Sequence, residues 1–259
     1  MIKKIRFYII VAITYFRVSY YYKLHFAGMI LQNVLTFTVL FLFFKWSGGI
    51  KGMTSKDLIT YYLLLTAFFN HLIPTVDISF FNSLRRGKLD SIMTLPVSLN
   101  GYFVSMHFEL LLFKLLIHAV IFILIALFVD IRFPSIKGGL MFLVATSISF
   151  IFYFIYRVFF TQFAYFVERA DALSFWSYYL FMFLSGGLLP LQLFPDTFRK
   201  ILYFTPFPYL IDYPLGIWLD RYSLNMHYLM IAIFYILIMT ALVRIISIKG
   251  IKRYAAYGG

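Results

Sequence analysis

Residues 84–98 read LRRGKLDSIMTLPVS and interrupt a chain that is apolar over most of its length. This basic stretch begins with cations around one glycine: Arg85, Arg86, Gly87 and Lys88. Apolar residues follow at the spacing of one helix face: Leu89, Ile92, Met93 and Leu95. Because proline lacks a backbone N–H and restricts the residue before it, we predict a short helix that ends near Leu95, ahead of Pro96. The basic stretch is either a loop between two membrane spans or a short helix offered to a partner outside the membrane.

The composition of the whole chain is typical of a membrane protein. The 259 residues are 63% apolar and only 13% charged, whereas a soluble domain carries about 25% charged residues. Continuous apolar runs of span length favour an all-α polytopic protein over a transmembrane barrel, which would show alternating ten-residue segments. The net charge of +13 lies in short clusters between apolar runs, so membrane topology explains it better than nucleic-acid binding does. We therefore expect one transmembrane domain over residues 1–259.

Six membrane spans are predicted, at residues 24–46, 58–81, 103–129, 139–166, 173–189 and 226–248. Residues 1–23 place basic and apolar side chains on two separate arcs, which predicts a helix lying in the membrane interface against lipid headgroups; the alternative is the ragged start of the first span. Six spans put both termini on one side. The loops of that side, which include the basic stretch, hold most of the Lys and Arg residues, so we expect it to face the cytoplasm.

Residues 185–221 form a Pro-rich segment, SGGLLPLQLFPDTFRKILYFTPFPYLIDYPLGIWLDR, with five of the eight prolines of the chain. A continuous span is incompatible with so many prolines. We predict short broken helices that enter the membrane from the outer side, with protein covering the irregular backbone.

Several polar residues lie within the predicted spans and either line a path or fix helix packing. They are Gln32, Asn33, His71, Asp77, Lys114, His118 and Arg157. Lys114 and His118 share a helix face, and Asp77 and Glu109 lie near the cytoplasmic ends of their spans, where Arg85 or Arg86 could pair with them. An ion or proton relay would need such groups, but packing is the simpler interpretation because no span carries a carboxylate near its midpoint.

The sequence shows no catalytic residues and no metal site. It lacks a phosphate-binding loop, a dinucleotide fingerprint and an H-E-x-x-H zinc pair, and its five histidines are scattered. There are no cysteines, which excludes disulfides and thiol chemistry. We therefore expect no catalysis from this chain alone.

Two segments resemble those of the type-2 ABC exporter permeases, most closely the bacterial ones whose ATPase is a separate chain. Residues 84–105 match the signature G-x-L-[DE]-x-x-[LM]-x-x-P-[VL]-S that follows the second span, at Gly87, Leu89, Asp90, Met93, Pro96, Val97 and Ser98. The Pro-rich segment matches the family's segment between the last two spans. Its matching positions are Ser185, Gly186, Leu189, Pro190, Phe194, Pro195, Pro206, Phe207, Tyr209 and Pro214, with Gly187 beside them.

The resemblance implies a permease in the bacterial cytoplasmic membrane, with both termini in the cytoplasm. Two permease chains, identical or related, would each dock one ATPase chain, and ATP and Mg would bind to the ATPase. The basic stretch would be the coupling helix in a groove of the ATPase, with its apolar residues in contact and its cations orienting it. Residues 1–23 would be a connecting helix, and the Pro-rich segment would form external re-entrant helices. A lipidic, peptide or drug-like substrate would move outward.

One departure from the family pattern concerns the residues ahead of Gly87. Many relatives have a glutamate-rich run there, whereas this chain has Asn82, Ser83, Leu84, Arg85 and Arg86, so the ATPase groove is expected to be more acidic. The alternative function is an ion- or proton-coupled transporter acting without an ATPase. It would need Lys114, His118 and Asp77 around a common cavity.

Overall fold

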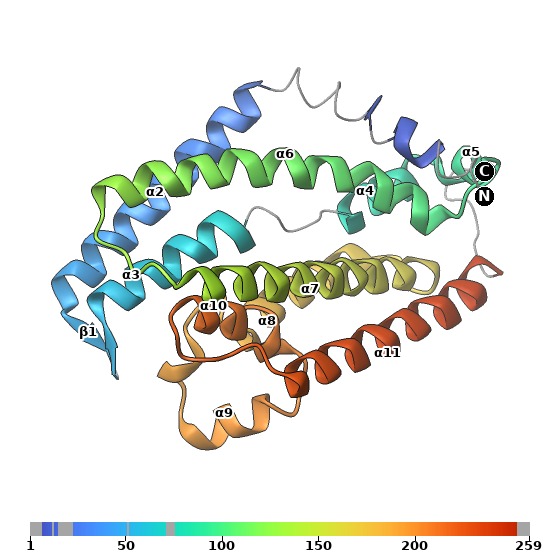
Figure 1. Cartoon of the computed structure of the whole chain (residues 1–259). Coiled ribbons are helices and arrows are strands. Elements are labelled where there is room, and N and C mark those ends of the chain that lie inside the picture. The colour runs from blue at the N-terminus through green and yellow to red at the C-terminus, as the bar shows by residue number, and fades with distance from the viewer. Residues whose placement is uncertain (1–6, 12, 15–22, 51, 71–75, 253–259) are drawn as a thin grey trace.

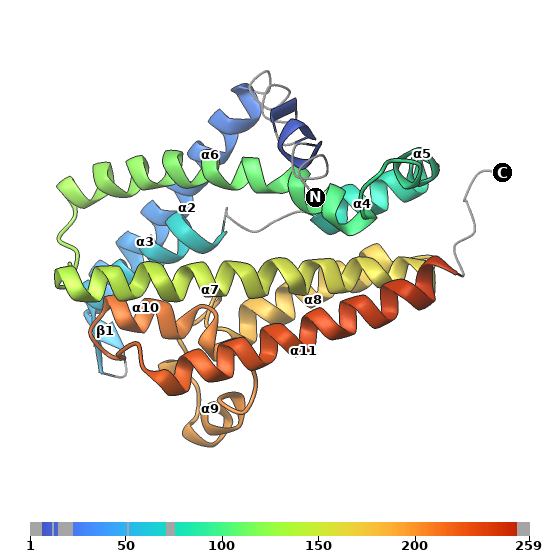
Figure 2. The ribbon, with the colours of Figure 1, turned by 45° about the vertical axis from the view of Figure 1, so that its right-hand side comes forward.

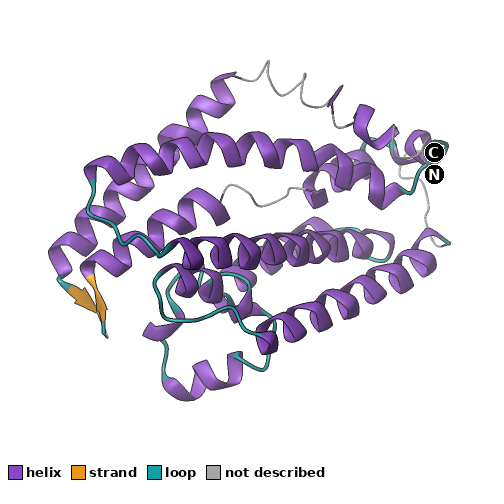
Figure 3. Ribbon diagram, in the orientation of Figure 1, coloured by secondary structure: helices purple, strands orange, loops and turns teal. Residues whose placement is uncertain are grey.

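The computed structural model of the chain describes residues 7–11, 13–14, 23–50, 52–70 and 76–252. These residues form an elongated bundle of helices with one short β-hairpin (Figure 3). The all-α fold class is therefore confirmed at the level of secondary structure. Residues 7–11 and 13–14 of the predicted interfacial helix are helical, and the rest of that prediction lies outside the described residues.

The long helices coincide with the predicted spans. They are α2 (Lys23–Ser47), α6 (Leu99–Phe128), α7 (Ile136–Thr161), which continues into the 3-10 helix η2 (Gln162–Tyr165), α8 (Ala170–Leu184) and α11 (Met226–Ile251). The second predicted span overlaps three elements: α3 (Ser55–Leu64), the π-helix η1 (Leu65–Asn70) and α4 (Val76–Arg85). By length and apolarity, two helices of the described part qualify as candidate membrane spans, at residues 136–165 and 226–251. The number of six crossings stays a prediction.

The remaining elements are short and lie between the long helices. The hairpin of β1 (Gly49–Ile50) and β2 (Met53–Thr54) joins α2 to α3, and α5 (Leu89–Met93) lies within the basic stretch. The Pro-rich segment contains four helices of three to seven residues: η3 (Leu191–Leu193), α9 (Asp196–Leu202), η4 (Phe207–Tyr209) and α10 (Asp212–Trp218). The expected break into short helices is thus observed.

The bundle has two distinct ends. Both views place α5 at the same end as the end of α11 and the start of α8 (Figures 1 and 2). The β-hairpin, α10 and the start of α11 lie toward the opposite end (Figures 1 and 2). The long helices therefore run back and forth between two ends of the bundle (Figures 1 and 2).

Polar caps begin several helices where the sequence leaves the apolar runs. Thr54 and Asp57 form a reciprocal capping box at α3. Ser98 and Ser135 accept a hydrogen bond from the backbone N–H of the residue three positions on, at the starts of α6 and α7. The α11 helix begins in the same way at Asn225. These side chains satisfy backbone donors that a helix start leaves free.

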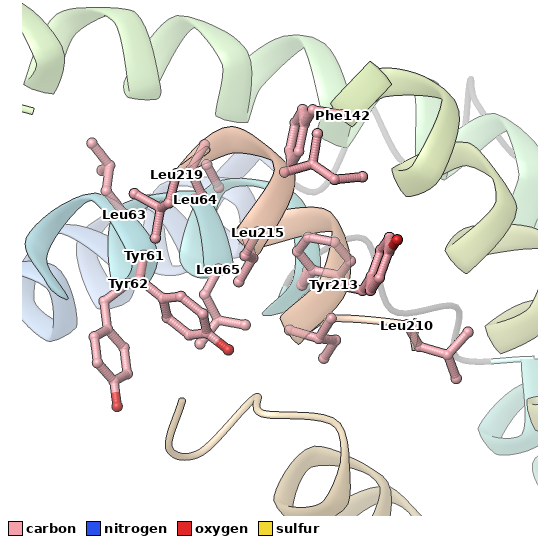
Figure 4. Packing of buried hydrophobic residues seen from close by; sticks show 14 of the residues in the cluster. Tyr61, Tyr62, Leu63, Leu64, Leu65, Phe142, Leu210, Tyr213, Leu215 and Leu219 are labelled. Carbon is pink, nitrogen blue, oxygen red and sulfur yellow. The ribbon is translucent and has the colours of Figure 1, made fainter. Parts of the chain in front are cut away.

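The buried apolar side chains form two clusters. The larger one joins α3, η1, α7 and the Pro-rich segment, and Figure 4 shows Tyr61, Leu65, Leu215 and Phe142 within it. The smaller one lies at the α5 end and joins α4, α5, α6 and η2. The basic stretch and the Pro-rich segment are thus each anchored to a core of their own.

Candidate functional site

The basic stretch begins where α4 stops. Gly87 has a φ of 63°, in the left-handed region that glycine adopts without a Cβ penalty. Its N–H bonds the carbonyl of Leu84 at 3.0 Å, and the N–H of Lys88 bonds that of Ser83 at 2.9 Å. This pair of bonds is the Schellman motif, which ends α4 and turns the chain into α5.

The apolar face of α5 packs against this chain itself. Leu89 is 0% exposed and Ile92 is 9% exposed, in the cluster that contains Phe80 and Phe103. Met93 and Leu95 are partly buried against the same cluster. Leu89 and Ile92 are thus packed within this chain, between α4 and α6, whereas Met93 and Leu95 stay partly exposed. The contact of these four residues with an ATPase stays a prediction.

The exposed side chains of α5 are polar, and the exposed cations of the basic stretch lie just before it. The exposed residues of α5, together with those of the flanking turns, are Arg85, Arg86, Lys88, Asp90, Ser91, Thr94 and Pro96. Among the side chains that the structure describes, Arg86, Lys88 and Asp90 take part in no ion pair. The surface that this stretch can present to a partner is thus electrostatic more than hydrophobic.

Two contacts hold the basic stretch in place from outside the cluster. Arg85, in the last turn of α4, forms an ion pair with Asp171 in the first turn of α8. At the other end, the N–H of Ser98 donates to the hydroxyl of Tyr8 at 3.3 Å. The N-terminal helical residues therefore touch the start of α6. Sequence reasoning missed both Tyr8 and Asp171, since neither belongs to a recognisable motif.

A buried ion pair connects α4, α7 and α8. The Nε of Arg157 donates to Oδ1 of Asp77 at 3.2 Å, and its Nη2 and the hydroxyl of Ser174 both donate to Oδ2. Asp77 is 1% exposed, Arg157 4% and Ser174 1%. The predicted pairing of Asp77 with Arg85 or Arg86 is therefore wrong. These charges fix helix packing, because each finds its partner inside the bundle.

The other polar residues of the spans do not join this pair. His118 of α6 bonds Asn33 of α2 through its Nε2, at 3.0 Å, in a buried position, and Gln32 is exposed. The α6 helix contains Lys114, whose side chain lies outside the described part, and His71 lies outside the described residues. His118 and Asp77 thus bind different partners on different helices, so this geometry gives no support to an ion relay that uses both. In the described part, no group of three or more His, Asp or Glu side chains is arranged to hold a metal.

The Pro-rich segment is tied to α3 at the turn after α8. Gly186 has a φ of 92°, and its carbonyl accepts a hydrogen bond from the hydroxyl of Tyr61 at 2.8 Å. A Cβ at Gly186 would lie 2.7 Å from that hydroxyl oxygen, so the close approach requires glycine. The Tyr62 hydroxyl donates to the Leu188 carbonyl at 3.0 Å.

The other predicted residues of the Pro-rich segment lie at the turns and helix starts that follow. They are Gly187 in the same turn, Pro190 before η3, Phe194 and Pro195 before α9, Pro206 and Phe207 at η4, and Pro214 in α10.

A buried carboxylate that the sequence analysis did not single out links the parts of this segment. Asp212 is 0% exposed, and its Oδ1 accepts from the N–H of Leu191 at 3.3 Å. Its Oδ2 accepts from the hydroxyl of Tyr222 at 3.3 Å, and its own N–H donates to the carbonyl of Ser185 at 2.9 Å. The signal that could have identified Asp212 in the sequence is its position as one acidic residue in an otherwise apolar run.

Replacing Asp212 by Asn is expected to change how stability depends on pH. Burial raises the pKa of Asp212, against the opposing effects of Arg221 and of the hydrogen bonds that it accepts. The raised pKa means that the folded protein disfavours the ionised form of Asp212. The contribution of this carboxyl group to the stability of the fold is therefore full at low pH and is lost as the pH rises through the raised pKa. Asp212→Asn keeps an acceptor oxygen but does not titrate. The melting temperature of the native protein should therefore fall relative to that of the variant between acidic and neutral pH, by about 2–4 °C per kcal/mol.

Thermal unfolding in detergent over this pH range measures the difference. The same substitution at an exposed carboxyl, Asp196→Asn at the start of α9, is measured alongside as a control for the exchange itself. Parallel curves for the native protein and Asp212→Asn would contradict the expected effect of burial on the Asp212 carboxyl.

Comparison with known proteins gives one family match, which covers most of the chain. Residues 30–258 match the family described as ABC-2 family transporter protein. A search of curated proteins finds no match for the sequence. The matched range includes the basic stretch, the buried ion pair and the whole Pro-rich segment.

Proposed function

The chain belongs to the family of ABC-2 transporter proteins, a family of membrane permeases that work with an ATPase component, and we propose that it is the permease subunit of an ATP-driven exporter. ATP hydrolysis is assigned to the ATPase component in this proposal, because residues 1–259 contain no phosphate-binding loop. ATP and Mg bind to that partner, and this chain supplies no catalytic residue. The energy for transport must then enter through a contact between the two chains.

The observation that carries this proposal is the exposed pair of cations just before α5. Leu89 and Ile92 of α5 are buried in the chain, while Arg86 and Lys88, in the turn that leads into α5, are exposed. A short helix held rigidly by its own apolar face is suited to transmit force, since it does not need to fold on contact. We assign to the basic stretch the role of the coupling helix, with its polar face toward an acidic surface of the ATPase.

The Pro-rich segment has the complementary role at the other end of the bundle. We propose that it forms the external re-entrant part of the permease and that it closes the path from outside. Two of its short helices, η4 and α10, pack into the cluster that contains α3 and α7, and in this proposal that packing shields their backbone from lipid. We further propose that two permease chains, identical or related, form the complex in the bacterial cytoplasmic membrane and export a lipidic, peptide or drug-like substrate.

Purification of the complex from its native membrane tests this function. A tagged copy of the chain, extracted in mild detergent, is expected to bring with it an ATP-binding-cassette ATPase and a second permease chain, with two ATPase chains in each complex. Mass spectrometry identifies the chains, and native mass measurement gives the stoichiometry. Recovery of the chain without any ATPase, while it remains folded and monodisperse, would contradict the proposal.

A further inference from the structure

A cavity of about 180 Å³ lies beside the basic stretch, between the last turn of α4, the helix η2 and the first turn of α8. Phe81, Leu84 and Ala164 contribute an apolar part of its lining, and each is almost fully buried. The charged side chains of the lining are Arg85, Glu168 and Asp171. The volume corresponds to about six water molecules, which is room for one long side chain.

The charge of this cavity is opposite to that of its surroundings. The exposed cations of the described residues near this end of the bundle include Arg86, Lys88 and Arg169, with Lys249 and Lys252 at the end of α11 (Figures 1 and 2). Glu168 is exposed and forms no ion pair with any described side chain. Arg85 occupies Oδ2 of Asp171. Among the side chains that the structure describes, no cation is therefore matched to Glu168.

We propose that this cavity receives a lysine side chain of the partner ATPase. The inference rests on the proposed function and adds one contact that fixes the position of the ATPase on the permease. An ATPase surface that complements the cations of the basic stretch must be acidic. A cation within that acidic surface would be attracted to the carboxylates at this cavity. The alkyl stem of the lysine would lie on Phe81 and Leu84, with the ammonium group beside Glu168.

Lysine fits this cavity better than arginine does. The guanidinium of arginine is a planar fork that suits the two oxygens of one carboxylate, and Arg85 already lies on Asp171. An ammonium group is a compact charge on a flexible stem, so it can approach Glu168 and the remaining oxygen of Asp171 from any direction.

Zero-length carbodiimide cross-linking of the purified permease–ATPase complex tests the proposal. This reagent joins a carboxylate to an amine only where the two are in contact. We expect a link from Glu168 or Asp171 to a lysine of the ATPase, identified by mass spectrometry of the linked peptides. Asp130, which is highly exposed and lies before α7 at the opposite end, should give no link to the ATPase.

A charge reversal gives a second, independent readout. Glu168→Lys should weaken the binding of the ATPase at least tenfold, whereas Asp196→Lys at the opposite end should leave it unchanged. Both residues are exposed, so neither change should prevent folding. A complex that forms normally, gives no such link and tolerates Glu168→Lys would overturn the inference and leave the proposed function standing.

Two other results distinguish a failure of the lysine assignment from a failure of the proposed function. A link from Glu168 to the amine of phosphatidylethanolamine would show that a lipid headgroup fills the cavity, which overturns the lysine assignment. Recovery of the chain with no ATPase at all would overturn the proposed function and, with it, this inference.

Discussion

Reversing the two free cations of the basic stretch, with Arg86→Glu and Lys88→Glu in one variant, is expected to reduce the ATPase bound to the permease at least tenfold. Both side chains are exposed and make no ion pair in the described part of the chain, so the change removes nothing that holds the permease together. It does replace two attractive charges by two repulsive ones at the proposed contact, and like charges across an interface cost several kcal/mol. The measurement is the amount of ATPase that co-purifies with each permease variant, normalised to the permease.

The matched control places the same change of charge at the opposite end of the bundle. Lys137 begins α7 and Lys200 lies in α9, and both are exposed. Lys137→Glu with Lys200→Glu should leave ATPase binding at the native level, since α9 and the start of α7 lie far from α5 (Figures 1 and 2). The native melting temperature should be kept by both double variants. Equal loss of ATPase from the two variants would show that net charge decides binding, and no loss from either would remove the basic stretch from the contact.

The existence of the basic stretch could be predicted from the sequence, but the direction in which its apolar face points could not. The spacing of Leu89, Ile92 and Met93 predicts one apolar face, and Pro96 predicts its end; the observed helix covers Leu89–Met93. Periodicity shows that a face must be buried without showing against what. Here Leu89 and Ile92 pack against α4 and α6, and we propose that the polar residues of the basic stretch make the contact with a partner.

The partner of Asp77 was beyond sequence reasoning for a geometric reason. Arg85 is the nearest cation downstream, but eight residues of helix separate the two, which is roughly 12 Å along the axis and too far for an ion pair. The actual partner, Arg157, is 80 positions away and reaches Asp77 only because α4 packs on α7. A single sequence carries no signal for that packing.

In the Pro-rich segment, too, the sequence predicts the local structure but not the packing. Its prolines predict that no continuous helix forms, and the four short helices agree with this. Their arrangement depends on Gly186, on the two tyrosines of α3 and on the buried Asp212, which come from distant positions. Hydrogen bonds between segments so far apart are a property of the folded chain, and only Gly186 among these residues was part of the predicted motif.

Removing one member of the buried pair, by Arg157→Gln, is expected to destabilise the permease by about 3–5 kcal/mol, because Asp77 is left charged and buried without its partner. Asp77→Asn should cost a similar amount, since it leaves the guanidinium alone between α4, α7 and α8. The measurement is the melting temperature in detergent, together with the yield of monodisperse protein. The control is Lys56→Gln, which breaks the exposed pair with Asp130 and should cost about 0–1 kcal/mol.

A double variant separates the loss of the pair from the loss of packing. Asp77→Asn with Arg157→Gln replaces both charges by amides that still hydrogen-bond each other and Ser174, so it should recover much of the stability that either single variant loses. Recovery follows if the single variants fail because of an uncompensated charge. If the double variant is as unstable as the sum of the two singles, the shape of the side chains and not their charge holds α4 on α7. Since α4 leads directly into the basic stretch, a loosened α4 in a variant that still folds should also weaken the response of transport to ATP.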